Sequence, residues 1–270
     1  MEQDTKEKLP SVKYHIDRER CRACGVCIMS CPDQAIQMAD GRAQIDEEKC
    51  KSCGKCLKKC RFGAIERDPI VLEEIDSTNR WLKDTDQAGI ADGTVVIARS
   101  QSSGRGRFER KFSSPKGGLY YSQLAKNFPG GEWLLKITPM VVVAVRRAIL
   151  ESTGIEADIK WINDLYVGGK KICGILCESL SIGQETDIIV GIGINVNTRR
   201  EDFAPEVQDI ASSLAMIKGE PVDMELLQKN LTRQLDKLLA RPKKLENEYF
   251  SEYRKYCFNC PEEIITVQEE

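Results

Sequence analysis

The sequence CRACGVCIMSC at residues 21–31 recurs as CKSCGKCLKKC at residues 50–60. Both runs have the spacing C-x2-C-x2-C-x3-C, with a glycine directly after the second cysteine. Three thiolates this closely spaced on a tight loop can each reach one iron of a 4Fe-4S cube, while the fourth starts a helical turn and points toward the other cube. The repeat therefore predicts two 4Fe-4S clusters whose ligand sets cross.

The crossed arrangement gives each cluster three cysteines of one run and the last cysteine of the other. One ligand set is Cys21, Cys24, Cys27 and Cys60, and the other is Cys50, Cys53, Cys56 and Cys31. A pair of zinc sites is the alternative interpretation. Structural zinc sites, however, use C-x2-C pairs with a longer gap between them, and not four cysteines in each run.

Length and charge set broad limits. A chain of 270 residues has room for about two domains, and its 40 basic and 42 acidic residues give no bulk electrostatic case for a nucleic-acid or membrane-surface partner. The first residues, MEQDTKEKLP, lack the apolar core of a secretory signal, and no run approaches the ~18 apolar residues of a spanning helix. We expect a cytoplasmic protein.

Cysteine and histidine usage narrows the chemistry. Twelve cysteines in a compartment that keeps thiols reduced indicate metal ligation more than disulfides. His15 is the single histidine of the chain, which excludes His-rich metal sites and any Ser-His or Cys-His nucleophile in which His15 does not take part. We expect His15 to be a solvated residue near the start of the first strand.

Residues 14–66 resemble the bacterial two-cluster ferredoxins. The resemblance implies an electron-transfer or redox-sensing domain over residues 14–67, after a flexible tail at residues 1–13, together with a redox partner. Arg61 stands where this family usually has the proline that Pro32 supplies in the first run. A basic residue there leaves ligation intact but can shift the potential of one cluster.

The segment ERDPIV at residues 66–71 is a short connection without a Gly/Ser-rich run, so the first domain should lie near the second, at residues 68–270. There the pattern is α+β with one dominant sheet. We expect strands at 71–75, 94–100, 118–124 and 187–197, and a hairpin over 164–178 that turns on Gly168 and Gly169. Helices should follow Asp76 and Ser77, run from Thr138–Pro139 to Gly154, and span 223–240 and 242–256.

Glycines alternate with arginines in QSSGRGRFER at residues 101–110. Glycine lets the backbone approach an anion, and Arg105, Arg107 and Arg110 supply forked donors for carboxylate and phosphate oxygens. Alone, this loop also fits an ordinary solvated basic surface. The blocks KWIND at 160–164 and GKKICGIL at 169–176 add lysines suited to a phosphoryl or acyl-phosphate group and oxygens suited to a magnesium nucleotide.

With these blocks in view, residues 71–267 resemble the biotin protein ligases. Six blocks occur in that family's order: residues 77–79 (STN), Gln101 with the loop 104–107 (GRGR), residues 114–115 with 117–120 (SP and GGLY), 160–164, 170–178, and 191–195 (GIGIN). The resemblance implies a class II synthetase-like, mixed α/β ligase domain. It also implies a reaction in which biotin and Mg-ATP form biotinyl-5'-adenylate, which then biotinylates a lysine of a carboxylase carrier protein.

The resemblance also assigns roles to individual residues. Lys171, Arg105 and Arg107 are expected to be catalytic. The biotin-binding residues are expected to be Ser77, Thr78, Asn79, Gln101, Arg105, Gly106, Arg107 and Lys171. The nucleotide-binding residues are expected to be Arg110, Phe112, Lys160, Asn163, Asp164 and Asn195. No histidine base is needed, because activation supplies the leaving group and catalysis is by positioning and electrostatics.

The sequence departs from the ligase family's pattern in three ways. Phe112 replaces the usual tryptophan beside the adenine, and Ile162 replaces the usual proline in the lysine–tryptophan block. The small SH3-like barrel that commonly ends the family is expected to be absent or truncated, which bears on carrier recognition and nucleotide affinity. The winged helix of repressor members is also expected to be absent, and with it DNA binding.

Several alternatives stay open at this point. The chain can be a ligase of another acyl cofactor such as lipoate, although that group carries a glycine-rich block ending in histidine and His15 lies in the wrong domain. It can also be a ferredoxin-type electron-transfer protein with a ligase-like binding domain, or a ligase gated by its clusters. Cys173 and Cys177 are expected to be buried sheet residues. The pair Cys257 and Cys260 is weak evidence for either a redox pair or a metal site.

Overall fold

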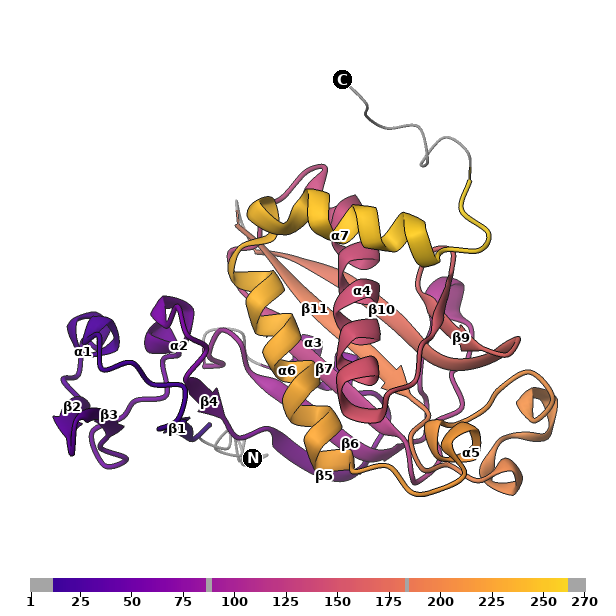
Figure 1. Ribbon diagram of the computed structural model, residues 1–270, viewed down its shortest axis with the longest axis horizontal. Helices are drawn as coiled ribbons and strands as arrows, with labels where there is room; N and C mark the ends of the chain where they lie inside the picture. The colour runs from indigo at the N-terminus through magenta and orange to yellow at the C-terminus, as the bar shows by residue number, and fades with distance from the viewer. Residues whose placement is uncertain (1–11, 86–88, 183–184, 262–270) are drawn as a thin grey trace, which may run out of the picture.

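The computed structural model describes residues 12–85, 89–182 and 185–261. A small module ends at residue 67 and lies at one end of the molecule, and the remaining chain packs helices against a large sheet (Figure 1). Residues 1–11 of the expected tail lie outside the described residues. No helix in the three described ranges is long and apolar enough to cross a membrane.

The sequence repeat in the small module is also a structural repeat. Each cysteine run forms one short helix that begins after a glycine, Gly25 or Gly54, with φ of 72° or 71°. The left-handed backbone at these two positions favours glycine. The helices are α1 (Val26–Ser30) and α2 (Lys55–Lys59). Two antiparallel strand pairs join them, β1 (Tyr14–Ile16) with β4 (Ile65–Arg67) and β2 (Ile36–Ala39) with β3 (Arg42–Ile45).

The second module is built on a seven-stranded sheet with the order β5-β6-β7-β11-β10-β9-β8. Only β5 and β6 pair in parallel, and the other neighbours are antiparallel. The strands are β5 (Ile70–Ile75), β6 (Val95–Gln101), β7 (Leu119–Ala125), β8 (Asp158–Lys160), β9 (Asp164–Val167), β10 (Lys170–Ile182) and β11 (Glu185–Ile194). The mixed pairing confirms the expected α+β class.

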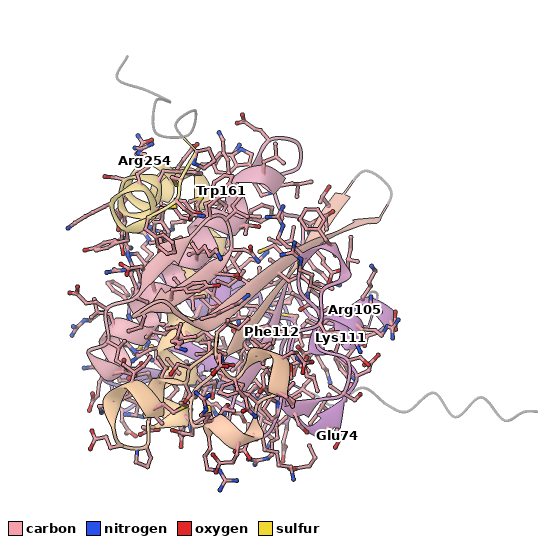
Figure 2. The ribbon with its side chains drawn as sticks, turned by 90° about the vertical axis from the view of Figure 1, so that its right-hand side faces the viewer. Glu74, Arg105, Lys111, Phe112, Trp161 and Arg254 are labelled. Atoms are coloured by element: carbon pink, nitrogen blue, oxygen red, sulfur yellow. The ribbon has the colours of Figure 1, made fainter. Side chains whose placement is uncertain are left out.

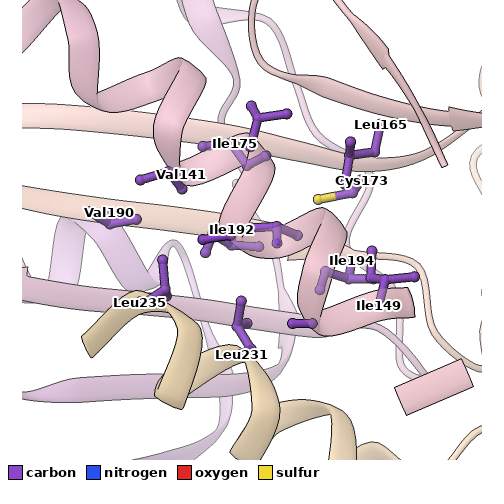
Figure 3. Close-up of a cluster of buried hydrophobic side chains, with 14 of the residues drawn as sticks. Val141, Ile149, Leu165, Cys173, Ile175, Val190, Ile192, Ile194, Leu231 and Leu235 are labelled. Carbon is purple, nitrogen blue, oxygen red and sulfur yellow. The ribbon is translucent and has the colours of Figure 1, made fainter. Parts of the chain in front are cut away.

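Five helices and three short 3-10 turns accompany this sheet. The helices are α3 (Thr78–Asp84), α4 (Trp133–Thr153), α5 (Leu214–Lys218), α6 (Met224–Ala240) and α7 (Pro242–Tyr256), and the turns are η1 (Arg107–Glu109), η2 (Arg200–Asp202) and η3 (Pro205–Val207). Helices α4 and α6 lie against one face, where Val141 and Leu235 meet Val190 and Ile192 of β11 (Figure 3). Leu82 of α3 packs with Ile189 in a separate cluster, because successive strand residues face opposite sides.

The expected start of the long helix was wrong. Helix α4 begins at Trp133, and Pro139 lies inside it instead of in its first turn. A proline inside a helix leaves the carbonyl four residues earlier without its partner, and here that residue is Leu135, which is 79% exposed. Trp133 and Leu134 pack against the main core, and their burial favours the longer helix. The expected stop at Gly154 agrees with its left-handed conformation.

The two modules meet at a buried ion pair. The side chain of Arg67, in the last strand of the small module, is fully buried and donates to both carboxylate oxygens of Asp236 in α6, at 2.9 and 2.8 Å. Gln123 of β7 donates to the same carboxylate at 2.8 Å. A second ion pair joins Lys58 of α2 to Asp92. The small module is therefore fixed against the sheet module, and not tethered freely.

Candidate functional sites

Two cavities in the small module bring together the cysteines that the sequence assigns to each cluster. One is lined by Cys31, Cys50, Cys53 and Cys56. The other is lined by Cys21, Cys24, Cys27 and Cys60. Each cavity thus draws three thiols from one run and the last thiol from the other run. Ligation itself stays a prediction, and the arrangement is the one that crossed ligand sets require.

The chemistry around these thiols fits a cubane cluster. The backbone N–H groups of Ala35 and Ala64 donate to the sulfurs of Cys31 and Cys60, both at 3.3 Å, at equivalent positions of the two runs. Such hydrogen bonds stabilise thiolates and tune a bound cluster. Among the described residues, no three His, Cys, Asp or Glu side chains converge as ligands of one metal ion. In a cubane, each thiolate binds its own iron.

A buried polar network in the sheet module joins the residues expected to bind biotin. Gln101 Oε1 accepts from the Thr78 N–H at 2.9 Å and from its hydroxyl at 3.2 Å. Ser122 of β7 donates to Thr78 Oγ1 at 2.7 Å and lies 2.6 Å from Asn79 Oδ1. The amide of Asn79 also donates to Glu178 at 2.8 Å. Buried polar atoms need partners, so this network fixes the side chains in one arrangement.

Ser77 is the N-cap of helix α3, as expected. Its side chain accepts from the Arg80 N–H at 3.5 Å, and its backbone is extended, as an N-cap residue requires. Partial burial raises the pKa of Asp76, but hydrogen bonds from Arg80 and from the Ser77 N–H outweigh it and lower the pKa overall. The charge of Arg105 lowers this pKa further, which places that guanidinium near the start of α3.

The arginine loop folds back on itself as a small hairpin. Gly106 N–H donates to the Arg110 carbonyl at 2.7 Å, and Phe112 N–H donates to the Gly104 carbonyl at 2.8 Å. A Cβ at Gly104 would lie 2.4 Å from the Phe112 carbonyl oxygen, so only glycine fits there. The side chains of Arg105, Arg107 and Arg110 are exposed, and none forms an ion pair with any residue that the structure describes. They are available to an anionic ligand.

Lys171 lies near both Phe112, which closes the arginine hairpin, and Asp164 of the sheet. Its Nζ lies 2.7 Å from Asp164 Oδ2 and 5.7 Å from the centroid of the Phe112 ring. The ring covers glycines of two neighbouring strands, since a Cβ at Gly193 would lie 2.4 Å and one at Gly174 3.0 Å from its carbons. Figure 2 shows Phe112 on this face, with Arg105 and Lys111 beside it. The structure thus brings expected catalytic and nucleotide-binding residues together.

Three other expected nucleotide-binding residues, Lys160, Asn163 and Asn195, make contacts within the protein. Lys160 Nζ lies 5.0 Å from the Tyr166 ring centroid, and the Asn163 amide donates to the Ile175 carbonyl at 2.8 Å. The amide of Asn195 donates to the Ser212 carbonyl at 3.0 Å. Two buried oxygens, Asp164 Oδ1 and Asn195 Oδ1, have no hydrogen-bond partner within the described ranges. Oxygens of this kind are suited to a magnesium ion or a ligand donor.

Gln101 Nε2 also donates to Ser114 Oγ at 3.0 Å. Three residues of the network were not predicted as site residues from the sequence: Ser114, Ser122 and Glu178. All seven residues of β7 are buried, so its sequence LYYSQLA shows no alternation that would single out Ser122. Glu178 lies at the end of a recognised block, but nothing in the spacing joins it to Asn79. The two polar residues of this buried strand, Ser122 and Gln123, were the available signal, and it does not distinguish between them.

The four remaining cysteines lie in the sheet module. Cys173 belongs to the main core cluster, and Cys177, Cys257 and Cys260 pack against it. Burial raises the pKa of Cys177 to about 12, and a hydrogen bond with Thr138 only partly opposes this. Burial and a hydrogen bond with Cys257 raise the pKa of Cys260 to about 12. The thiols of Cys177 and Cys260 are therefore protonated at neutral pH.

Comparison with known proteins places both modules. Residues 71–195 match the profile of the Biotin/lipoate A/B protein ligase family, and residues 13–61 match the 4Fe-4S dicluster domain. The solved biotin protein ligase from Aquifex aeolicus, in complex with biotin and ATP, is 33% identical with a TM-score of 0.61, over 71% of this chain and 78% of that chain. The chain belongs to the biotin/lipoate protein ligase family. Both resemblances inferred from the sequence are therefore confirmed.

Curated members of the ligase family give a similar result. The bifunctional ligase/repressor BirA of Bacillus subtilis (strain 168) is 37% identical over 151 residues, which are 55% of this chain and 46% of that protein. The biotin--[acetyl-CoA-carboxylase] ligase of Paracoccus denitrificans is 30% identical over 134 residues, 49% of this chain and 55% of that protein. The chain thus spans about half the length of these family members.

Proposed function

We propose that the protein is an ATP-dependent biotin–protein ligase that carries two 4Fe-4S clusters in its N-terminal module. The observation that carries the ligase proposal is the position of Lys171, which is paired with Asp164, lies beside Phe112, and shares the sheet module with the exposed arginine loop. The relatives' names and the Aquifex complex with biotin and ATP supply the substrates.

In the first half-reaction, a carboxylate oxygen of biotin attacks the α-phosphorus of ATP. The new O–P bond forms biotinyl-5'-adenylate, and the bond to the leaving pyrophosphate breaks. Negative charge builds on the carboxyl and α-phosphate oxygens, where the Nζ of Lys171 and the guanidinium groups of Arg105 and Arg107 stabilise it. Asp164 orients Lys171, because one of its oxygens is bound to Nζ and fixes that group in place.

In the second half-reaction, a lysine amine of a carrier protein attacks the carbonyl carbon of the mixed anhydride, and AMP leaves. The buried network of Thr78, Asn79, Gln101 and Ser122 offers fixed donors and acceptors to the ureido ring of biotin. Asp164 Oδ1 and Asn195 Oδ1, both buried without partners among the described residues, are the oxygens we assign to the magnesium nucleotide.

The cysteine cavities would hold the clusters, and the clusters would supply one-electron chemistry when bound. This chain's contribution is to provide eight thiolates in two crossed sets and the amide donors of Ala35 and Ala64. Iron and acid-labile sulfide analysis after anaerobic purification tests this part. Two 4Fe-4S clusters per chain are expected, and bound zinc in their place would contradict the proposal.

Biotin-dependent exchange between ATP and pyrophosphate tests the ligase part. Exchange is expected with biotin and not with lipoate or octanoate, followed by biotin transfer to a carboxylase carrier domain. Exchange with lipoate alone would make the chain a lipoate ligase, and a folded protein without any exchange would leave the sheet module as a binding scaffold. Rates with clusters oxidised, reduced and removed decide whether the clusters gate the reaction, because equal rates would exclude gating.

A further inference from the structure

The two halves of the small module share a backbone but differ in charge. Helices α1 and α2 have the same length and the same left-handed glycine before them. Residues 21–34 carry one basic and one acidic residue, Arg22 and Asp33. Residues 50–63 carry five basic residues and no acidic one. They are Lys51, Lys55, Lys58, Lys59 and Arg61. The second cysteine run is therefore strongly basic, and the first is not.

Four of these five cations have no ion-pair partner among the described residues. Lys58 is paired with Asp92 of the sheet module at 2.5 Å. The other four, here called the basic collar, are Lys51, Lys55, Lys59 and Arg61. All four are exposed, and none forms an ion pair within the described part of the chain. Like charges gathered without counter-charges repel one another, so the collar brings no stability of its own.

Two residues of the collar, Lys51 and Lys55, lie beside the most accessible thiol of their cavity. Cys53 is exposed, whereas Cys56 of the same run is buried. Lys51 lines the cavity that these cysteines share, and Lys55 begins the helix directly after Cys53 and Gly54. Phe62, which follows Arg61, is 45% exposed and lines the other cavity, together with Cys60. Electrons enter or leave a cluster where a ligand approaches the surface, and here Lys51 and Lys55 flank that ligand, Cys53.

Two simpler explanations account for the collar less well. Charge compensation of a thiolate-ligated cluster does not by itself explain the collar, because three of the four thiols of the other cavity lie in a run whose one basic residue is Arg22. They are not needed to fix the small module in place either, since that contact uses Lys58 and Arg67. The collar is thus a positive surface without counter-charges among the described residues, beside the exposed Cys53. The surface that complements it is a negative one on another molecule.

We propose that the basic collar is the docking surface for a protein electron carrier whose redox group lies within a carboxylate-rich face. The proposal rests on the presence of the clusters and adds the route by which they exchange electrons. One electron leaves the reduced carrier, one cluster gains it, and no bond is made or broken. The carrier approaches Cys53, with Lys55 and Lys59 supplying most of the attraction.

Binding of flavodoxin, a small acidic flavoprotein, to the full cluster-loaded chain tests the proposal. Calorimetric titration is expected to give a Kd that rises about tenfold or more between ionic strengths of about 0.02 and 0.2 M, as screened charge pairs require. The variant K55Q/K59Q removes two positive charges from the collar. It is expected to raise the Kd at low salt by about tenfold and to slow cluster reduction by reduced flavodoxin in proportion.

The variant R22Q/M29E is the matched control. It changes the net charge by the same amount at exposed positions of the first run, where Met29 is 80% exposed. Its Kd is expected to stay within about twofold of the parent, because only long-range attraction changes. Equal weakening by both variants would reduce the collar to bulk charge and overturn the proposal.

Three further results would also overturn it. They are salt-independent binding, equally tight binding of basic cytochrome c, and displacement of flavodoxin by a short DNA duplex that binds the collar more tightly. Iron and sulfide analysis of each sample keeps this test separate from the proposed function. A chain without clusters refutes the cluster assignment. A cluster-loaded chain whose affinity for flavodoxin does not depend on the collar refutes the docking surface.

Discussion

At the scale of single residues, Lys171 of the candidate ligase site is held at both its backbone and its side-chain tip. Its Nζ is paired with Asp164 at 2.7 Å, its N–H donates to the Ile210 carbonyl, and its carbonyl accepts from the Ser212 N–H. Both the backbone and the tip of this side chain are therefore fixed. A preorganised cation stabilises developing negative charge without reorganising during the reaction.

Replacing Lys171 by glutamine is expected to slow biotin-dependent ATP–pyrophosphate exchange about 10²- to 10³-fold while the protein stays folded. The loss follows because glutamine keeps most of the side chain's volume but carries no charge. Lys170→Gln is the matched control, since neighbouring strand residues face opposite sides of the sheet. An exchange rate for K171Q within about threefold of the parent would show that Lys171 takes no part in the chemistry.

Single-residue roles were predictable where they follow from local sequence. The N-cap role of Ser77 is visible from the chain alone, because a capping side chain acts within three residues of itself. The pairing of Lys171 with Asp164 depends on the register of β9 and β10, which shifts at an irregularity between Lys171 and Cys173. Such a bulge leaves no mark in the hydrophobic pattern, so that partner was not predictable.

At the scale of elements, glycines in β10 and β11 make room for the site. Gly191 of β11 stands opposite Ser122 of β7, and a Cβ there would lie 2.1 Å from Asn79 Oδ1. The missing side chain lets Asn79 reach across the sheet to the Leu176 carbonyl and to Glu178. The apolar run of β11 predicted a strand correctly, but not the close approach that its glycines permit.

Gly191→Ala is expected to raise the Kd for biotin about tenfold or more and to lower the free energy of unfolding by about 1–3 kcal/mol. The added methyl group must displace the Asn79 amide and thereby break its bond to Ser122. Biotin titration followed by fluorescence and urea unfolding measure the two effects. Gly130→Ala is the control, because its Cβ would meet only Thr186 Oγ1, at 3.5 Å. Equal biotin affinity in both variants would refute the role of Gly191.

At the scale of the whole molecule, the two modules depend on each other through Arg67. Its burial alone would lower its pKa, but the charge of Asp236 and the hydrogen bonds to it more than compensate, and the pKa is raised. The short connection in the sequence predicted that the modules lie close together. The partner of Arg67 lies 169 residues away, a pairing that depends on tertiary packing and was beyond prediction from one sequence.

Replacing Arg67 by methionine is expected to lower the free energy of unfolding of the sheet module by about 3 kcal/mol, because Asp236 would stay partly buried with only Gln123 as partner. The double variant R67M/D236L is expected to recover most of this loss, since it removes both charges. Urea unfolding measures both changes. Alanine at His15, whose pair with Asp68 is exposed, is the control and should cost less than about 1 kcal/mol.

Removal of the clusters is expected to destabilise the sheet module through loss of the ion pair between Arg67 and Asp236. The buried core of the small module has eight residues, two of them the cysteines Cys21 and Cys56, and a core this small needs a metal centre to stay folded. Oxidative removal of iron with a chelator should therefore unfold the module, separate β1 from β4, and release Arg67 from Asp236. The sheet module should lose about 3 kcal/mol, as in R67M, because the same carboxylate is left unpaired.

The R67M variant makes this coupling measurable. Removing the clusters from R67M is expected to cost the sheet module less than about 1 kcal/mol more, since the ion pair is already absent. Exchange between ATP and pyrophosphate at saturating substrate should survive removal in the parent chain, because the network around Thr78 and Lys171 lies wholly in the sheet module. An equal loss of stability in the parent and in R67M would show that the clusters act on the ligase by a route that bypasses Arg67.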